Sequence, residues 1–241
     1  MLELHHALIS TCSQKVRWVL AEKQLDWVDH RVQLDREEHL RPEYLRLNPN
    51  GVVPTLVHEG EPVIDSSVIN EYLDECFDAH PLRPASALAR ARMRAWRQYF
   101  DEVATPSVRY PSFNIAFVPH FQRMSDEEFR AYAEQRPLRR DFYLKMGRHG
   151  FPPDELNAAL ARLRQTFERM AGALADGPWL VGTQMTLADI SILPTVVRLA
   201  DLGLPMLWQD LSEVARWYRR MQDRPAFEAT FVPGSRDLTL H

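Results

Sequence analysis

Hydrophobic and polar positions follow two different patterns along the chain. In residues 1–79, short strand-like runs alternate with stretches in which apolar residues recur every three or four positions, the spacing of a helix that buries one face. The predicted strands are Leu2–His6, Trp27–Gln33, Thr55–His58 and Glu61–Ile64, and the predicted helices are Ser13–Lys23 and Ser66–Phe77. This order of elements predicts a small sheet with helices packed on it.

A segment with two prolines, 78–84, interrupts the first pattern and is the predicted domain boundary. Beyond it the spacing of apolar residues is helical, most clearly at 88–103, 156–174 and 211–221. We therefore predict an α/β domain at residues 1–79 and an all-helical domain at residues 86–241.

A long insertion, 105–153, lies within the helical domain. It carries six prolines, and its only helical signal is at 125–134. Because it is longer than a connection between bundle helices needs to be, we expect it to shape a binding site.

Composition narrows the class of protein. A chain of 241 residues with 45% hydrophobic and 26% charged residues is typical of a globular protein with a sizeable core. The formal charge of −4 gives no support to binding of nucleic acid or an anionic membrane. The chain has neither an apolar run long enough to span a bilayer nor a signal segment, and two cysteines make no disulfide framework. We expect a cytoplasmic protein without a structural metal.

The chemistry is concentrated in residues 8–17, where a predicted strand gives way to a helix. Ser10 and Cys12 lie at the start of that helix, where unpaired N–H groups and the helix dipole stabilise anions. A thiolate is therefore easier to form there, either on Cys12 or on a bound thiol cofactor. Ser10 is equally suited to be a plain helix N-cap.

Four motifs in this order resemble those of glutathione transferases. They are Ser10-Thr11-Cys12-Ser13 with the helix that follows, Asn48-Pro49-Asn50-Gly51-Val52-Val53-Pro54, Asp65-Ser66 with its helix, and Trp179-Leu180-Val181-Gly182 followed by Thr186-Leu187-Ala188-Asp189. The resemblance implies a thioredoxin-like domain that binds glutathione, followed by an all-helical domain that binds a hydrophobic or aromatic small molecule. It also implies a homodimer.

The resemblance leaves open which residue activates the thiol. The zeta-class pattern puts the catalytic hydroxyl on Ser10 and a supporting thiol on Cys12. A hydroquinone-dehalogenase branch would instead make Cys12 the nucleophile that resolves a mixed disulfide. Alignment with the bacterial β-aryl-etherase branch places the serine at Ser13. A hydroxyl that donates to sulfur favours the thiolate and lowers its pKa.

The resemblance also implies which residues bind glutathione. Val53 would pair its backbone with the cysteinyl backbone of the tripeptide, next to a cis peptide bond before Pro54. Asp65 and Ser66 would hold the γ-glutamyl carboxylate, with Ser66 also able to cap its helix. His39 matches a position that meets the glycyl carboxylate. From the residues alone, Pro54 is an ordinary edge-strand proline and His39 a surface histidine.

Stretches across the chain, the insertion included, are similar to the β-aryl-etherase branch. The similarity implies that glutathione displaces a phenolate from a carbon next to a ketone. We expect aromatic residues of the insertion to form the aryl pocket: Tyr110, Phe113, Phe117, Phe121 and Tyr143. A zeta-type isomerase and a non-catalytic transferase-like binding module are the alternatives.

Other residues are expected to be structural. Cys76 lies on an apolar stripe and is predicted to be in the core. Thr186 and Asp189 form a predicted capping box. His5 and His6 are interpreted as packing or surface residues.

Overall fold

The computed structural model describes residues 1–238. The first part of the chain folds into a four-stranded mixed sheet with the order β2-β1-β3-β4. Its elements are β1 (Leu2–His6), α1 (Thr11–Glu22), β2 (Val28–Arg31), η1 (Glu38–Leu40), α2 (Pro42–Leu47), β3 (Thr55–His58), β4 (Glu61–Ile64) and α3 (Ser66–Cys76). Strand β1 is parallel to β2 and antiparallel to β3, which in turn is antiparallel to β4.

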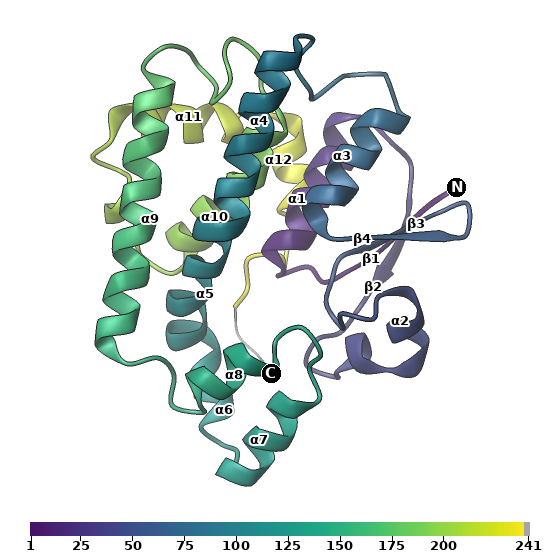
Figure 1. The fold of residues 1–241 in the computed structure, drawn as a ribbon, viewed down its shortest axis with the longest axis vertical. Coiled ribbons are helices and arrows are strands. Elements are labelled where there is room, and N and C mark those ends of the chain that lie inside the picture. The colour runs from purple at the N-terminus through teal and green to yellow at the C-terminus, as the bar shows by residue number, and fades with distance from the viewer. Residues whose placement is uncertain (239–241) are drawn as a thin grey trace.

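The two faces of the sheet follow from the alternation in β1. Leu2 and Leu4 are buried in the main core together with residues of α1 and α3. His5, from the other set, meets the ring of Tyr44 in α2 edge-on, with the centroids 6.2 Å apart. Helices α1 and α3 therefore cover one face, and α2 lies on the other (Figure 1).

The rest of the described chain is helical. It comprises α4 (Ala87–Tyr99), η2 (Phe100–Ala104), α5 (Thr105–Ser112), η3 (Phe113–Phe117), α6 (Val118–Phe121), α7 (Asp126–Glu134), α8 (Arg140–Met146), α9 (Pro153–Leu174), α10 (Leu187–Asp201), η4 (Pro205–Leu207), α11 (Ser212–Gln222) and α12 (Pro225–Thr230). Helix α9 lies alongside the run from α4 to α5, and α10 packs against α1 (Figure 1). The expected thioredoxin-like part followed by a helical part is confirmed. The division at residues 79 and 86 stays a prediction.

The expectation of little helix in the insertion is wrong. Helical structure continues from α4 to the end of α6, through the π-helical turns η2 and η3. Pro106 and Pro119 lie in the first turns of α5 and α6, and Pro111 lies inside α5, which is flanked by the two π turns. The first turn of a helix tolerates proline, because the proline ring fixes φ at a helical value and the missing N–H would have no partner there.

Cys76 is also placed differently from the prediction, because its side chain is exposed. The buried stripe of α3 is narrower than the sequence pattern indicates: Ile69 and Leu73 are fully buried, whereas Val68 is 56% exposed. Cys76 lies in the last turn, at the exposed end of this pattern. It therefore belongs to the surface.

Two layers of contacts join the sheet part to the helical part. The guanidinium of Arg97 in α4 pairs with Glu71 of α3 at 2.7 Å and also donates to the Ser67 carbonyl oxygen. In the second contact, Asp101 of η2 accepts from Lys15 Nζ at 3.0 Å. Both parts thus share one core.

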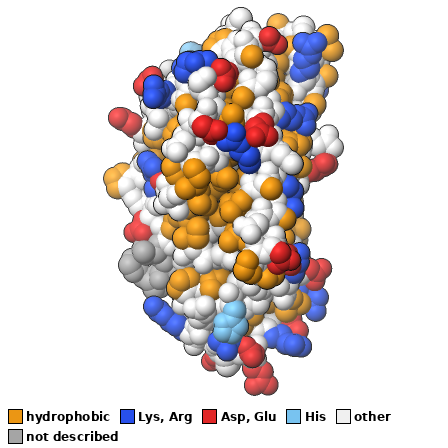
Figure 2. Space-filling view, turned by 90° about the vertical axis from the view of Figure 1, so that its left-hand side faces the viewer, with side chains coloured by type: hydrophobic (Ala, Val, Ile, Leu, Met, Phe, Trp, Pro, Cys, Tyr) orange, Lys and Arg blue, Asp and Glu red, His pale blue; other side chains and the backbone are white. Residues whose placement is uncertain are grey.

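On one surface of the helical part, hydrophobic and charged side chains are separated. On the side of α9, hydrophobic side chains gather near the middle, with charged side chains above and below them (Figure 2). Among the described residues, the structure contains no helix with the length and apolar character needed to cross a membrane.

Candidate functional site

A cavity of about 210 Å³ opens at the start of α1. One wall comes from the sheet part, through the residues before and within the first turn of α1 and through 51–53. The opposite wall comes from α5, η3 and the segment 136–143. The insertion therefore does line a site, as its length indicated.

The first turn of α1 presents a hydroxyl and a thiol to this cavity. Ser10 is the N-cap, and its Oγ accepts a hydrogen bond from the Ser13 amide at 3.2 Å. Cys12 is a free, partly exposed cysteine in the same wall. The structure thus brings two of the three candidate activating residues into one cavity.

Ser13, the third candidate, is fully buried and is not among the lining residues. Its Oγ accepts a hydrogen bond from the Ala7 amide at 3.4 Å. In this arrangement Ser13 ties the end of β1 to the first turn of α1, and its side chain does not reach the cavity.

The backbone before Pro54 forms another part of the wall. The Val53–Pro54 peptide bond is cis, and Val53 lines the cavity while Pro54 lies buried behind it. The Val52 carbonyl oxygen accepts hydrogen bonds from Tyr44 Oη at 2.7 Å and Asn48 Nδ2 at 2.9 Å. Side chains of α2 and the loop after it therefore fix this segment.

His39 lines the same cavity with only 8% of its surface exposed. Its Nδ1 has no hydrogen-bond partner within residues 1–238. Burial, and next the positive charge of Arg136, lowers the pKa of His39 to about 4, against an opposing effect of Glu37. The imidazole is neutral at neutral pH and has a polar atom available for a ligand.

Asp65 and Ser66 do not line this cavity. The N-cap of α3 is Asp65, not Ser66 as expected, and its Oδ1 accepts from the amides of Ser67 and Val68 at 2.8 and 3.1 Å. Asp65 has a φ of 72°, which directs its short carboxylate back over the first turn. Ser66 is buried in that turn, and its neighbour Ser67 donates to Asp101 at 2.5 Å.

Arginines are the functional residues that the sequence interpretation missed. Four of them line the cavity: Arg109, Arg136, Arg139 and Arg198. Three of them lie in the insertion, and the density of arginines in that segment is the sequence feature that could have indicated a cationic site. Burial, and next the charge of Arg139, lowers the pKa of Arg109 to about 10, so its guanidinium stays protonated at neutral pH.

Three of the five aromatic residues expected to form an aryl pocket lie in the cavity wall. Phe113, Phe117 and Tyr143 line the cavity. Tyr110 instead packs on the ring of Phe151, with centroids 4.0 Å apart. Phe121 is 2% exposed and belongs to a separate aromatic core beside the cavity.

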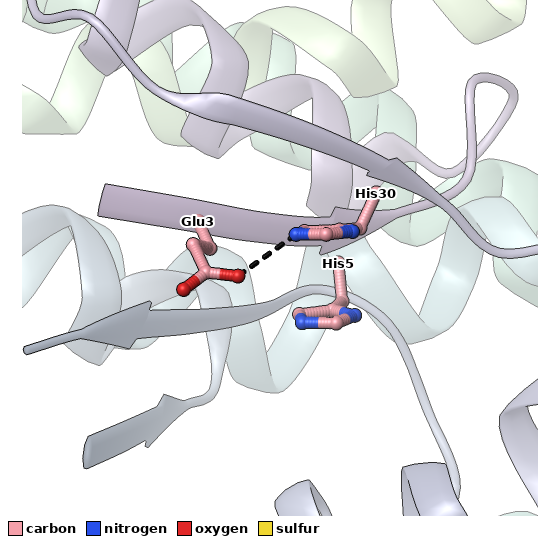
Figure 3. Close-up of side chains that lie close together, drawn as sticks. All are labelled: Glu3, His5 and His30. Carbon is pink, nitrogen blue, oxygen red and sulfur yellow. Dashed lines mark hydrogen bonds and ion pairs between the residues drawn. The ribbon is translucent and has the colours of Figure 1, made fainter. Parts of the chain in front are cut away.

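The described residues also hold a group of possible metal ligands away from this cavity. Glu3, His5 and His30 of β1 and β2 have ligand atoms within 4.8 Å of one another. His30 Nε2 lies 2.8 Å from a Glu3 carboxylate oxygen, and the two imidazoles stack with centroids 4.5 Å apart (Figure 3). Because the residues come from two strands, their spacing along the chain did not reveal them.

Comparison of this chain with known proteins identifies its relatives. The family model for the glutathione S-transferase N-terminal domain matches residues 9–76, and that for the C-terminal domain matches residues 153–220. Protein LigF of Sphingobium sp. strain SYK-6 is 30% identical over 229 residues, covering 92% of this chain and 89% of LigF. Tetrachloro-p-hydroquinone reductive dehalogenase of Sphingobium chlorophenolicum is 26% identical, with 96% of each chain covered.

A solved structure agrees with the sequence matches. The crystal structure of beta-etherase LigF from Sphingobium sp. strain SYK-6 superposes with a TM-score of 0.86 at 28% identity, covering 95% of this chain and 98% of that one. Two domain models and a relative matched over nearly its full length agree on one family. The chain belongs to the glutathione S-transferase family.

Proposed function

We propose that the protein binds glutathione at the start of α1 and directs its thiolate to an electrophilic carbon of an aromatic substrate. The observation that carries the proposal is the shared cavity. Ser10, Cys12, Val53 and His39 all line it, together with aromatic side chains of the insertion. In this proposal Val53 meets the tripeptide backbone and the free Nδ1 of His39 meets its glycyl carboxylate.

We assign thiol activation to Ser10. Its Oγ already accepts the capping hydrogen bond from the Ser13 amide, and its own proton has no acceptor among the described residues. That proton can be donated to sulfur, which favours the thiolate and lowers its pKa. Ser13 is less suited, because its hydroxyl is fully buried and does not line the cavity.

Single alanine substitutions test this assignment. Ser10→Ala should lower kcat/KM with 1-chloro-2,4-dinitrobenzene by at least about 10-fold and raise the apparent pKa of its pH profile. Ser13→Ala should leave that pKa in place and change stability instead. A pH profile that shifts with Ser13→Ala and not with Ser10→Ala would refute the assignment.

Aryl-ether cleavage is the acceptor reaction we propose. Its support is the similarity to LigF over nearly the whole chain and the aromatic wall of Phe113, Phe117 and Tyr143. The thiolate would attack the carbon next to the ketone, forming a C–S bond as the C–O bond breaks and phenolate leaves. Incubation with glutathione and a simple β-aryl-ether ketone should release phenol, and no release above background would exclude this reaction.

Cys12 supports a second candidate function, reductive dehalogenation. Its thiol lines the cavity, and the dehalogenase relative covers almost the whole chain. Glutathione thiolate would first displace chloride from the ring, forming a C–S bond as the C–Cl bond breaks. The Cys12 thiolate would then attack that sulfur, forming an S–S bond as the C–S bond breaks, and the ring carbon takes a proton from solvent. A second glutathione would resolve the mixed disulfide and release glutathione disulfide. Cys12→Ala should then abolish formation of glutathione disulfide from a chlorinated hydroquinone and leave Ser10-dependent substitution intact.

A homodimer and a cytoplasmic location stay predictions. The homodimer prediction rests on the resemblance to glutathione transferases. Light scattering should give twice the chain mass of 28.0 kDa. The location is supported by the two free cysteines, which are typical of a reducing compartment.

A further inference from the structure

The cavity is markedly cationic in a protein that is acidic overall. Arg109, Arg136, Arg139 and Arg198 line it, and no aspartate or glutamate is among its lining residues in the described chain. The whole sequence has a formal charge of −4. The positive charge is therefore a local feature of this wall.

Two of the four arginines are already engaged. Arg136 pairs with Glu37 at 2.7 Å, and its guanidinium lies 3.1 Å from the centroid of the Tyr132 ring. Arg198, on α10, donates a hydrogen bond to the Ile9 carbonyl oxygen and so holds the chain before α1. These contacts give both arginines a structural role.

The other two guanidinium groups have no partner. Neither Arg109 of α5 nor Arg139, the N-cap of α8, forms a side-chain hydrogen bond or ion pair within residues 1–238, and both are half-buried. They also repel each other, since the charge of Arg139 lowers the pKa of Arg109. The carboxylate of Asp101 also acts on Arg109, but it already accepts hydrogen bonds from Lys15 and Ser67. It therefore offsets only part of the repulsion, and an anion supplied by a ligand would offset the rest.

The residues around Arg109 and Arg139 indicate that a bound anion would lie on the sulfur side of the cavity. Cys12, in the first turn of α1, lies within electrostatic reach of Arg109. Both carboxylates of glutathione lie at the ends of the tripeptide, away from the sulfur that this turn would hold. The buried Oγ1 of Thr105, one turn before Arg109, lines the same cavity and has no partner among the described residues.

We propose that the electrophilic substrate carries a carboxylate, which Arg109 and Arg139 bind while Phe113, Phe117 and Tyr143 contact its aromatic ring. The inference rests on the proposed transferase function, and it adds the charge of the second substrate. Guanidinium groups suit this task because their planar N–H pairs match a carboxylate.

A matched pair of ligands tests the charge preference. With S-methylglutathione in place of glutathione, so that no thiol reacts, calorimetry compares 4-chloro-3-nitrobenzoate with 4-chloro-3-nitrobenzamide. The wild type should bind the carboxylate at least about 10-fold more tightly, as charge-assisted hydrogen bonds imply. Arg109→Gln and Arg139→Gln should each remove most of that preference and leave affinity for the amide unchanged.

Control variants separate charge recognition from general damage. Arg219→Gln removes an exposed arginine of α11 that does not line the cavity, and it should keep the wild-type preference. Arg109→Lys should retain part of it, because the positive charge remains. The melting temperature of Arg109→Gln should be no lower than that of the wild type, because the substitution removes a half-buried cation whose charge Asp101 only partly offsets.

Turnover gives a second readout. Glutathione thiolate attacks C4 of either compound, the C–S bond forms as the C–Cl bond breaks, chloride leaves, and the thiol proton passes to solvent. Rates are divided by the uncatalysed rate with glutathione, because the amide activates the ring more strongly. In Arg109→Gln the KM for the benzoate should rise about 10-fold, while the KM for glutathione stays unchanged.

Different failures point to different claims. Equal wild-type affinity for benzoate and benzamide overturns the carboxylate inference, even if glutathione transfer proceeds normally. A rise in the KM for glutathione in Arg109→Gln also overturns it, because the arginine would then serve the tripeptide. Absence of any binding of glutathione or S-methylglutathione overturns the proposed function itself.

Discussion

Burial lowers the pKa of both His39 and Arg109, but only His39 loses its positive charge at neutral pH as a result. His39 has a pKa of about 4, so it is neutral and can only exchange hydrogen bonds with a ligand. Arg109 has a pKa of about 10 and keeps its charge. Within the described chain, the cavity therefore contains a neutral polar group at His39, beside an Arg136 that is paired with Glu37, and two guanidinium groups without a hydrogen-bonded partner at Arg109 and Arg139. A ligand with a polar end and an anionic end would be oriented by these two groups.

His39 also predicts a pH dependence of stability. Its pKa is about 4 in the folded protein and near 6.5 in the unfolded chain, so between these values only the unfolded chain takes up the proton. The buried neutral His39 therefore costs the folded protein nothing above pH 6.5. As the pH falls from 6.5 toward 4, protonation of the unfolded chain lowers the free energy of unfolding. The full size of this fall is roughly 3 kcal/mol.

His39→Gln should remove this contribution. Urea unfolding at pH 7 and pH 4.5 should show the free energy of unfolding falling by roughly 2–3 kcal/mol less in the variant than in the wild type. His58→Gln, a histidine outside the cavity, serves as the control and should follow the wild type. Parallel falls in wild type and His39→Gln would contradict the prediction.

The sequence pointed to part of this site and missed the rest for a physical reason. Ser10, Cys12, His39 and Val53 belong to motifs, and all of them line the cavity. Arg109 and Arg139 are far apart in the chain, and they line the same cavity because the chain turns after α6 and again after α7, which places the start of α8 on the same wall as α5. No local spacing encodes that arrangement.

At the level of single elements, the start of α10 depends on one buried carboxylate. Asp189 accepts hydrogen bonds from the amides of Thr186 and Leu180, at 2.9 and 3.0 Å, and from Trp217 Nε1 at 2.9 Å. It closes the predicted capping box and also ties α10 to α11 and to the turn before α10. Its role is therefore wider than the sequence indicated.

Asp189→Ala should destabilise the protein by about 3 kcal/mol or more, because several buried donors lose their acceptor at once. Trp217→Phe removes only one of these donors but also leaves a small void at a fully buried position, so it should cost roughly 2 kcal/mol. Chemical denaturation followed by circular dichroism measures both. Equal costs for the two substitutions would show that the carboxylate is not the shared acceptor that the geometry indicates.

Elements were predictable where the pattern of burial is simple. Strands β3 and β4 have the predicted bounds, since Gly60 marks the turn between two short apolar runs. Helix α2 was missed because Pro42–Leu47 is too short for a clear period. The run through α5 and α6 was missed because prolines at first-turn positions look like breaks in a sequence.

For the whole molecule, the important contacts are those between the sheet part and the helical part. Glu71 is held between two arginines of α4: although burial opposes ionisation, hydrogen bonds from Arg94 and Arg97 keep its pKa below the usual range. Arg97 is only 4% exposed. This ion pair lies at the same junction as Lys15 and Asp101.

Arg97→Ala should therefore weaken the junction by about 2 kcal/mol, since Glu71 keeps Arg94 while the Ser67 carbonyl oxygen loses its donor. Arg92→Ala, an exposed arginine of the same helix, is the matched control and should lie within about 0.5 kcal/mol of the wild type. Urea unfolding gives both values. A double-mutant cycle with Glu71→Ala isolates the pair, and zero coupling would contradict this account.

The two walls of the cavity come from separate segments of the chain, residues 9–53 and residues 105–143. The thiol-handling residues all precede α3, whereas both unpartnered arginines follow α4. A chimaera that takes only the segment from α5 to α8 from a relative leaves the junction contacts of Lys15, Arg97 and Arg198 in place. It should keep tripeptide binding and acquire the relative's preference among electrophilic substrates. The preference for charged substrates would then be transferable with the segment from α5 to α8, without changing the residues that bind the thiol.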